Sequence, residues 1–129
     1  MREHKYRAWH KGEGRMVEVM CIDWHYSRIE FARNEADKEW ATLPSASLEK
    51  VILIQFTGLL DKNGVEIYEG DLFWWNWHDS PILRIVEFQY GAFIGRDVGH
   101  IIPMQHLFNF PLSQIEVIGN QWENPELLA

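Results

Sequence analysis

The sequence has only one cysteine, Cys21, among its 129 residues. A single thiol excludes an intramolecular disulfide framework and fits a reducing compartment. Because Cys21 falls inside the apolar run 16–22, we expect a buried thiol and not a nucleophile. The chain also lacks the ~20 consecutive apolar residues that a membrane-spanning helix needs, and it begins without the apolar stretch of a signal peptide. We therefore expect a soluble, cytoplasmic protein.

Signatures of catalysis and of cofactor binding are missing as well. The six histidines form no HExxH motif, and none has the spacing from cysteine that zinc sites use. The sequence contains no GxSxG nucleophile motif and no GxxxxGK[ST] phosphate loop. We therefore predict no catalytic, metal-binding or cofactor-binding residues, and a protein that is not an enzyme.

Basic residues are also scarce, since 12 Lys and Arg stand against 19 Asp and Glu, a net charge of −7. An acidic chain is a poor non-specific ligand for nucleic acid, because phosphates must be neutralised by clustered cations. The N-terminus is the exception, with five basic and two acidic residues in the first fifteen. This segment is either a solvated hairpin or a phosphate-contacting patch, whose candidate contacts are Arg2, Lys5, Arg7 and Lys11.

Aromatic residues, by contrast, are abundant: they make up 14% of the chain and include seven Trp. Short β-branched and aromatic runs alternate with Gly, Pro, Asn and Asp at intervals of about ten residues, which predicts a mainly β, β-rich α+β fold. Residues 34–43 have helical spacing, with Asn34 as a cap, and 44–47 form a connection between two possible subdomains. The expected strands are 5–9, 16–21, 28–31, 48–56, 71–77, 82–88, 92–96, 101–106 and 115–118.

Four segments occur in an order that resembles the YopX-like family of phage and prophage proteins over essentially the whole chain. They are Arg7-Ala8-Trp9, the segment 55–71 (QFTGLLDKNGVEIYEGD), Val86-Glu87-Phe88 followed by Gly91 and Phe93, and the segment 116–128 (EVIGNQWENPELL). The resemblance implies one domain, 1–129, encoded in a phage or prophage genome. It also implies an N-terminal β-rich part, 1–47, followed by a small SH3-like barrel, 48–129. It brings no established biochemical activity.

The segment 55–71 also carries four carboxylates, Asp61, Glu66, Glu69 and Asp71. Their spacing gives no calcium-loop pattern. Asp61 opens the sequence DKNG, in which Asn63 and Gly64 tolerate positive φ, and an Asp in such a turn accepts hydrogen bonds from backbone N–H groups. We therefore interpret these carboxylates as structural groups of turns and not as catalytic acids.

The run 73–78 (FWWNWH) directly follows this segment. On a strand, Phe73, Trp75 and Trp77 would share one face, and Trp74 would lie on the other with His78. Aromatic rings on both faces leave two alternatives. Either a second layer or a sister subunit covers the outer rings, or they form a surface for a partner. The candidate interaction surface is Phe73, Trp75, Trp77 and His78.

Two functions follow from these observations. The first is a non-enzymatic protein–protein interaction module that self-associates or binds a host or phage protein. The alternative is a single-stranded nucleic-acid-binding module, in which bases stack on exposed Trp rings and the basic N-terminus contacts phosphates. The acidic remainder of the chain disfavours this alternative.

Overall fold

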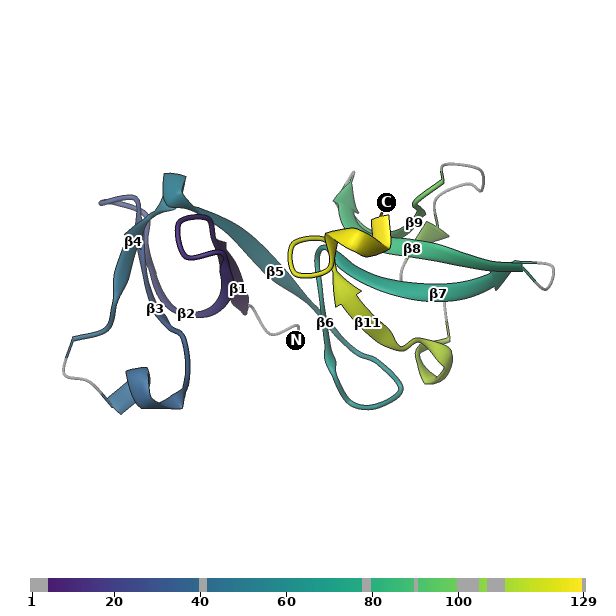
Figure 1. The fold of residues 1–129 in the computed structure, drawn as a ribbon, viewed down its shortest axis with the longest axis horizontal. Coiled ribbons are helices and arrows are strands. Elements are labelled where there is room, and N and C mark those ends of the chain that lie inside the picture. Colours follow the sequence, from purple (N-terminus) through teal and green to yellow (C-terminus); the bar gives the residue numbers. More distant parts are fainter. Residues whose placement is uncertain are drawn as a thin grey trace. The chain divides into compact units, whose positions relative to one another are not determined.

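The computed structural model of the chain describes residues 5–39, 42–77, 80–89, 91–99, 105–106 and 111–128, and it confirms a mainly β fold (Figure 1). Short 3₁₀ turns link some of the strands: η1 Glu35–Glu39, η2 Leu48–Lys50, η4 Leu112–Gln114 and η5 Pro125–Leu128. The strands are β1 Tyr6–His10, β2 Arg15–Asp23, β3 Arg28–Ala32, β4 Ser45–Ser47, β5 Val51–Leu60, β6 Glu66–Tyr68, β7 Asp71–Trp77, β8 Ser80–Gln89, β9 Ala92–Asp97, β10 Gln105–His106 and β11 Val117–Asn120. Within these ranges no helix has the length and apolar character needed to cross a membrane.

The chain divides into two compact units, and the division falls between Gln55 and Phe56. Residues 4–55 form the N-terminal unit, and 56–129 belong to the C-terminal unit. This division lies inside β5, whereas the sequence placed a subdomain connection at 44–47. The ten-residue β5 explains the position, because its first half pairs with β1 and its second half pairs with β6.

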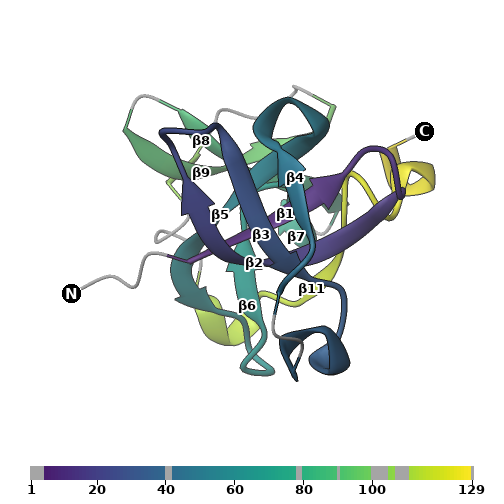
Figure 2. The same cartoon turned by 90° about the vertical axis from the view of Figure 1, so that its left-hand side faces the viewer.

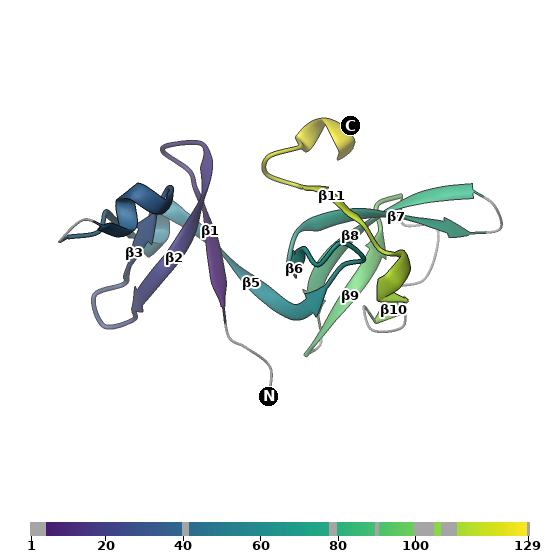
Figure 3. The same cartoon turned by 90° about the horizontal axis from the view of Figure 1, so that it is seen from below.

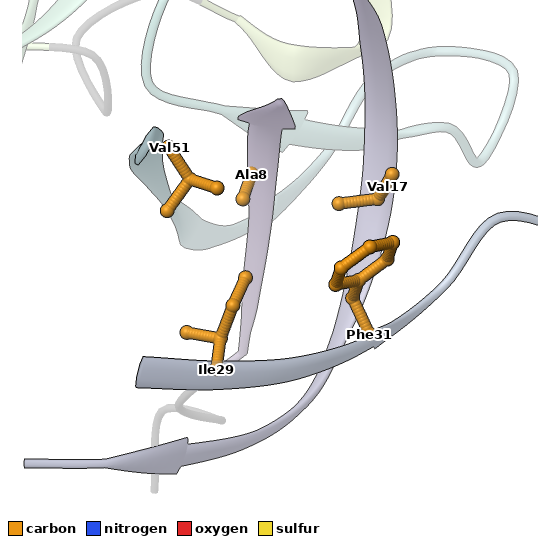
Figure 4. Close-up of a cluster of buried hydrophobic side chains, with 5 residues drawn as sticks. All are labelled: Ala8, Val17, Ile29, Phe31 and Val51. Carbon is orange, nitrogen blue, oxygen red and sulfur yellow. The ribbon is translucent and has the colours of Figure 1, made fainter. Parts of the chain in front are cut away.

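In the N-terminal unit the strands pair antiparallel in the order β4-β3-β2-β1-β5 (Figure 2). Alternate residues of these strands point inward, as the period-two pattern requires. Side chains from four of the strands meet in a buried cluster (Figure 4), which consists of Ala8, Val17, Ile29, Phe31 and Val51. Each of these side chains is at most 6% exposed, so this unit has a hydrophobic core of its own.

Cys21 is exposed, which corrects the expectation of a buried thiol. The β2–β3 register shifts between Val19 and Cys21. A β-bulge adds one residue to a strand and so reverses the alternation of faces beyond it. Met20 and Cys21 are therefore both exposed, and Ile22 takes the place on the inner face where it packs against the core cluster.

The expected helix at 34–43 is only the single 3₁₀ turn η1 over its described residues. The Asn34 side chain does cap it, because its Oδ1 accepts a hydrogen bond from the backbone N–H of Asp37 at 3.1 Å. The segment 44–47, expected as a connection, contains the short strand β4, which pairs with β3. Of the expected strand 101–106, residues 101–104 lie outside the described part, and Gln105–His106 form β10.

The C-terminal unit contains a second antiparallel sheet in the order β10-β9-β8-β7-β11, and Figure 3 shows β7, β8 and β9 as neighbours. Its buried cluster lies on the face of β7 that carries Phe73. The cluster consists of Ile67, Phe73, Val86 and Ile115, with Leu59, Trp75, Phe93 and Val117 packed against it. The description of this unit as an SH3-like barrel stays a prediction.

A charged pair is buried in this second sheet. Arg84 is fully buried, and it lies directly opposite the buried Asp97 in the β8–β9 register. Its Nη1 donates to the carbonyl oxygen of Gly95 at 2.8 Å, and Asp97 accepts from the backbone N–H of Gly99 at 2.8 Å. Burial lowers the pKa of Arg84, and the charge of Asp97 opposes that effect.

Candidate functional site

Asp61 organises the turn between β5 and β6 by accepting three backbone hydrogen bonds. Its Oδ1 receives the N–H groups of Asn63 at 2.8 Å and Val65 at 2.9 Å, and its Oδ2 receives that of Val117 at 3.0 Å. Burial raises the pKa of Asp61, but these donors and the charge of Lys62 outweigh burial and hold the pKa below its ordinary value. The turn is thereby tied to the start of β11, which agrees with the structural role predicted for Asp61.

The other carboxylates of the segment 55–71 differ in their surroundings. Asp71 is buried and accepts the backbone N–H of Tyr68 at 2.8 Å, and Glu66 accepts the Tyr68 hydroxyl at 3.2 Å. Glu69 is half-buried beside Glu87, at a hollow of about 290 Å³. Burial, and secondly the charge of Glu87, raise the pKa of Glu69. Over the described residues no group of three or more His, Cys, Asp or Glu side chains could hold a metal ion.

A groove of about 360 Å³ opens beside the Asp61 turn, and its volume lies in the range typical of ligand-binding clefts. It combines residues from the turn, from the middle of β7 and from the segment that leads into β11. Two segments that carry the family resemblance, 55–71 and 116–128, therefore contribute to one groove. The residues of β7 that line it directly follow the first of these segments. The lining residues are Lys62, Trp74, Trp75, Gln114, Glu116 and Ile118.

The structure separates the aromatic residues of β7 by face. Phe73 is completely buried in the core, and Trp75 packs partly buried against the same cluster. Phe73 is thus corrected from a candidate surface residue to a core residue, because its face of β7 is the inner one. Trp74 points to the opposite face and is 49% exposed. Of the other two candidates, the side chain of Trp77 and the whole of His78 lie outside the described residues.

The sequence reasoning missed Trp74 as the exposed ring, and it also missed Gln114 and Glu116. Alternation along β7 had placed Trp74 on the face opposite Phe73, but it could not tell which face is inner. The proximity of Glu116 to the groove follows from long-range pairing, since the N–H of Lys62 donates to the carbonyl oxygen of Ile115 at 2.9 Å. No local sequence pattern reports such a contact.

Charge is distributed unequally between the two units. Residues 56–129 hold ten acidic and three basic side chains, a net charge of −7, whereas residues 4–55 hold eight of each. The whole net charge of the chain therefore belongs to the unit that contains the groove. The three basic residues of 56–129 each lie beside a carboxylate: Arg84 beside Asp97, Arg96 with its Nε 2.7 Å from Glu87 Oε1, and Lys62 with its Nζ 3.6 Å from Glu116 Oε2.

The candidate phosphate contacts lie at the N-terminus, and the structure describes three of the four. Lys5 and Arg7 are half-buried. Lys11 is exposed, and its Nζ donates to the carbonyl oxygen of Glu49 at 3.2 Å. Arg2 lies outside the described residues. The groove and the described candidate contacts thus belong to different units of the chain.

A second group of exposed aromatic residues lies at the β2–β3 hairpin tip in the N-terminal unit. Trp24 is 67% exposed and Tyr26 is 70% exposed. The rings of His25 and Tyr26 meet edge-on with centroids 4.7 Å apart, and the Arg28 guanidinium lies 5.8 Å from the Tyr26 centroid. Trp24 is exposed and does not line the groove, so it is a natural comparison for Trp74.

The fold defines a class, namely small β proteins with two antiparallel sheets. Within this class the chain belongs to the YopX family. The model of this family, described as YopX protein, matches residues 5–129. A comparison with curated proteins gives no match.

Two solved structures are similar over the full length. Protein EF1440 from Enterococcus faecalis is 26% identical, with a TM-score of 0.69 and complete coverage of both chains. Protein yopX from Bacillus subtilis is 20% identical, with a TM-score of 0.65 and coverage of 100% of this chain and 98% of the other. The second likeness concerns the fold alone.

Proposed function

We propose that this chain is a phage- or prophage-encoded accessory protein that acts in the host cytoplasm by binding another protein, without catalysis. The groove beside Trp74 carries the proposal. Trp74 is half exposed at the wall of this groove, and Trp is enriched among the residues that dominate binding energy in protein interfaces. The phage origin and the compartment are expectations carried by the family resemblance.

The surroundings of Trp74 support a protein partner over a nucleic acid. Bases could stack on an exposed indole, but phosphates need unpaired cations nearby. Each of the three basic residues of 56–129 lies beside a carboxylate, and this range has a net charge of −7. Affinity for a polyanion would therefore be opposed at the groove.

Capture from host lysate tests this function. The tagged chain is compared with Trp74→Ala and with the matched control Trp24→Ala, each with and without nuclease treatment. We expect a defined protein that is retained by the wild type and the control, is lost with Trp74→Ala, and is insensitive to nuclease. Capture that nuclease abolishes would instead support the nucleic-acid alternative. Equal capture by all three chains would contradict the role of the groove.

Self-association through the same groove is one form of this proposal. Sedimentation velocity over a hundredfold range of concentration measures it directly. A dimer that dissociates with Trp74→Ala but not with Trp24→Ala would identify a second copy as the partner. A monomer throughout would leave a host or phage protein as the partner.

A further inference from the structure

The turn between β5 and β6 holds the backbone of Glu116 in place at the groove. Asp61 Oδ2 accepts the backbone N–H of Val117 at 3.0 Å. The N–H of Lys62 donates to the carbonyl oxygen of Ile115 at 2.9 Å. These two bonds flank Glu116 on either side along the chain. The turn therefore presents the Glu116 carboxylate to the groove from a fixed backbone.

The Glu116 carboxylate keeps capacity for a ligand. Its Oε1 accepts from Asn63 Nδ2 at 3.4 Å, and its Oε2 lies 3.6 Å from Lys62 Nζ. Both distances are long for contacts of a charged group, which are typically below about 3 Å. The side chain is also 53% exposed, so water screens the ion pair and the pair contributes little stability. A cation that approaches more closely could therefore replace Lys62 at small cost.

Trp74 lines the same groove and is 49% exposed, and its ring favours a particular kind of cation. An indole face attracts positive charge, and a guanidinium is the cation found there most often. The planar guanidinium both stacks on aromatic rings and donates paired hydrogen bonds to carboxylates. Residues 56–129 have a net charge of −7, which favours a basic ligand at the groove over an acidic one.

We propose that Glu116 and Trp74 form the binding site for an arginine side chain of the partner protein. The inference rests on the proposed function and specifies what the partner presents to the groove, which at about 360 Å³ has room for this side chain. The guanidinium lies on the Trp74 ring and donates to the Glu116 carboxylate in place of Lys62. Trp74 supplies most of the affinity, and Glu116 selects arginine over neutral and acidic side chains.

Selection from a random 12-residue peptide library displayed on phage particles supplies the probe, with the full chain as target and Trp74→Ala for counter-selection. We expect the enriched peptides to share an arginine. Replacement of that arginine by citrulline, which keeps its shape but has no charge, should weaken binding about tenfold. Trp74→Ala should weaken binding at least about tenfold, whereas Trp24→Ala should leave it within about twofold.

Variants of the Lys62–Glu116 ion pair should change the affinity of an arginine peptide in opposite directions. Glu116→Gln should weaken binding about threefold, and Glu39→Gln, which alters an exposed carboxylate of the N-terminal unit, should have no effect. Lys62→Met keeps the aliphatic stem but removes the competing cation, so it should strengthen binding about threefold.

A double-mutant cycle shows whether Glu116 contacts the guanidinium itself. If it does, the citrulline peptide should be nearly insensitive to Glu116→Gln, because the charged partner is already absent. Equal losses for the arginine and citrulline peptides would mean that Glu116 acts only on the shape of the groove, and would overturn the inference.

Other outcomes would also overturn it. These are Trp74-dependent peptides without arginine, weaker binding with Lys62→Met, or a library that yields no Trp74-dependent peptide. None of them decides the proposed function, because capture of a protein from host lysate tests that function independently.

Discussion

Asp61 allows the sharpest test of how the family segment stabilises the C-terminal unit. In Asp61→Asn the side chain keeps its shape but loses its charge, and an NH₂ group replaces one carboxylate oxygen. With the remaining oxygen toward Asn63 and Val65, the NH₂ group faces the N–H of Val117, so two donors oppose each other. If the amide is turned around, its NH₂ group faces the N–H groups of Asn63 and Val65, so these two hydrogen bonds are lost and the one from Val117 is kept. Either orientation leaves a partly buried N–H without its acceptor.

The expected loss follows from the number of bonds. A hydrogen bond to a charged group contributes about 1.5–3 kcal/mol. One lost bond, together with two that become neutral, should lower the free energy of unfolding by about 2–4 kcal/mol. That is a large part of the 5–15 kcal/mol typical of a small domain. Asp23→Asn is the matched control, because Asp23 Oδ1 accepts one backbone hydrogen bond, from the N–H of Tyr26 at 3.0 Å, and the substitution should cost about 1 kcal/mol.

The pH dependence gives this prediction a second readout. The pKa of Asp61 is lower in the folded protein than its ordinary value, so its ionised form stabilises the fold. This stabilisation is fully present above the unfolded pKa of about 4 and is lost as the pH falls through the folded pKa. The difference between wild type and Asp61→Asn should therefore shrink between pH 5 and pH 2. Urea unfolding at several pH values, followed by Trp fluorescence, measures it. A difference below about 0.5 kcal/mol at pH 7, or one that does not change on acidification, would refute the reasoning.

Three further predictions concern the C-terminal unit. Asp97→Asn should lower the free energy of unfolding by about 3 kcal/mol in urea titration, since it removes the negative charge that lies opposite the buried Arg84; an unchanged midpoint would contradict this. Gly70→Ala should shift thermal unfolding downward by several degrees, because Gly70 has φ +88° and a Cβ would collide with the Trp122 ring; an unaltered melting temperature would argue against that contact. Glu69→Gln should stabilise the protein at neutral pH and not near pH 3, because burial raises the pKa of Glu69 and its ionised form opposes folding; a loss of stability at pH 7 would be inconsistent with this.

Local patterns in the sequence predicted much of the fold. The alternation of residues and the turn residues located β7 at its observed bounds and gave the core of β2, β3, β8 and β9. They missed the short β4 and β6, whose three residues are held by pairing with β3 and β5 and not by their own composition. They also could not predict the bulge in β2, which is a property of the strand pair and decides the exposure of Cys21.

The candidate site was predicted only in part. The run 73–78 drew attention to the right strand, but the choice between its two faces depends on which side the core lies. Phe73 and Trp74 are equally aromatic neighbours, and only packing against Ile67, Val86 and Ile115 makes the first a core residue. The contribution of Glu116 depends on a contact between segments about 50 residues apart in the sequence.

Site-specific photocrosslinking tests the central claim most directly. A benzoylphenylalanine at position 74 reports what touches the groove in the living host, and the same residue at position 24 reports on the other exposed Trp. We predict a discrete crosslink to one protein from position 74 and none to that protein from position 24. Crosslinks to nucleic acid, crosslinks from position 24 alone, or none from position 74 would contradict the assignment of the Trp74 groove as the partner-binding site.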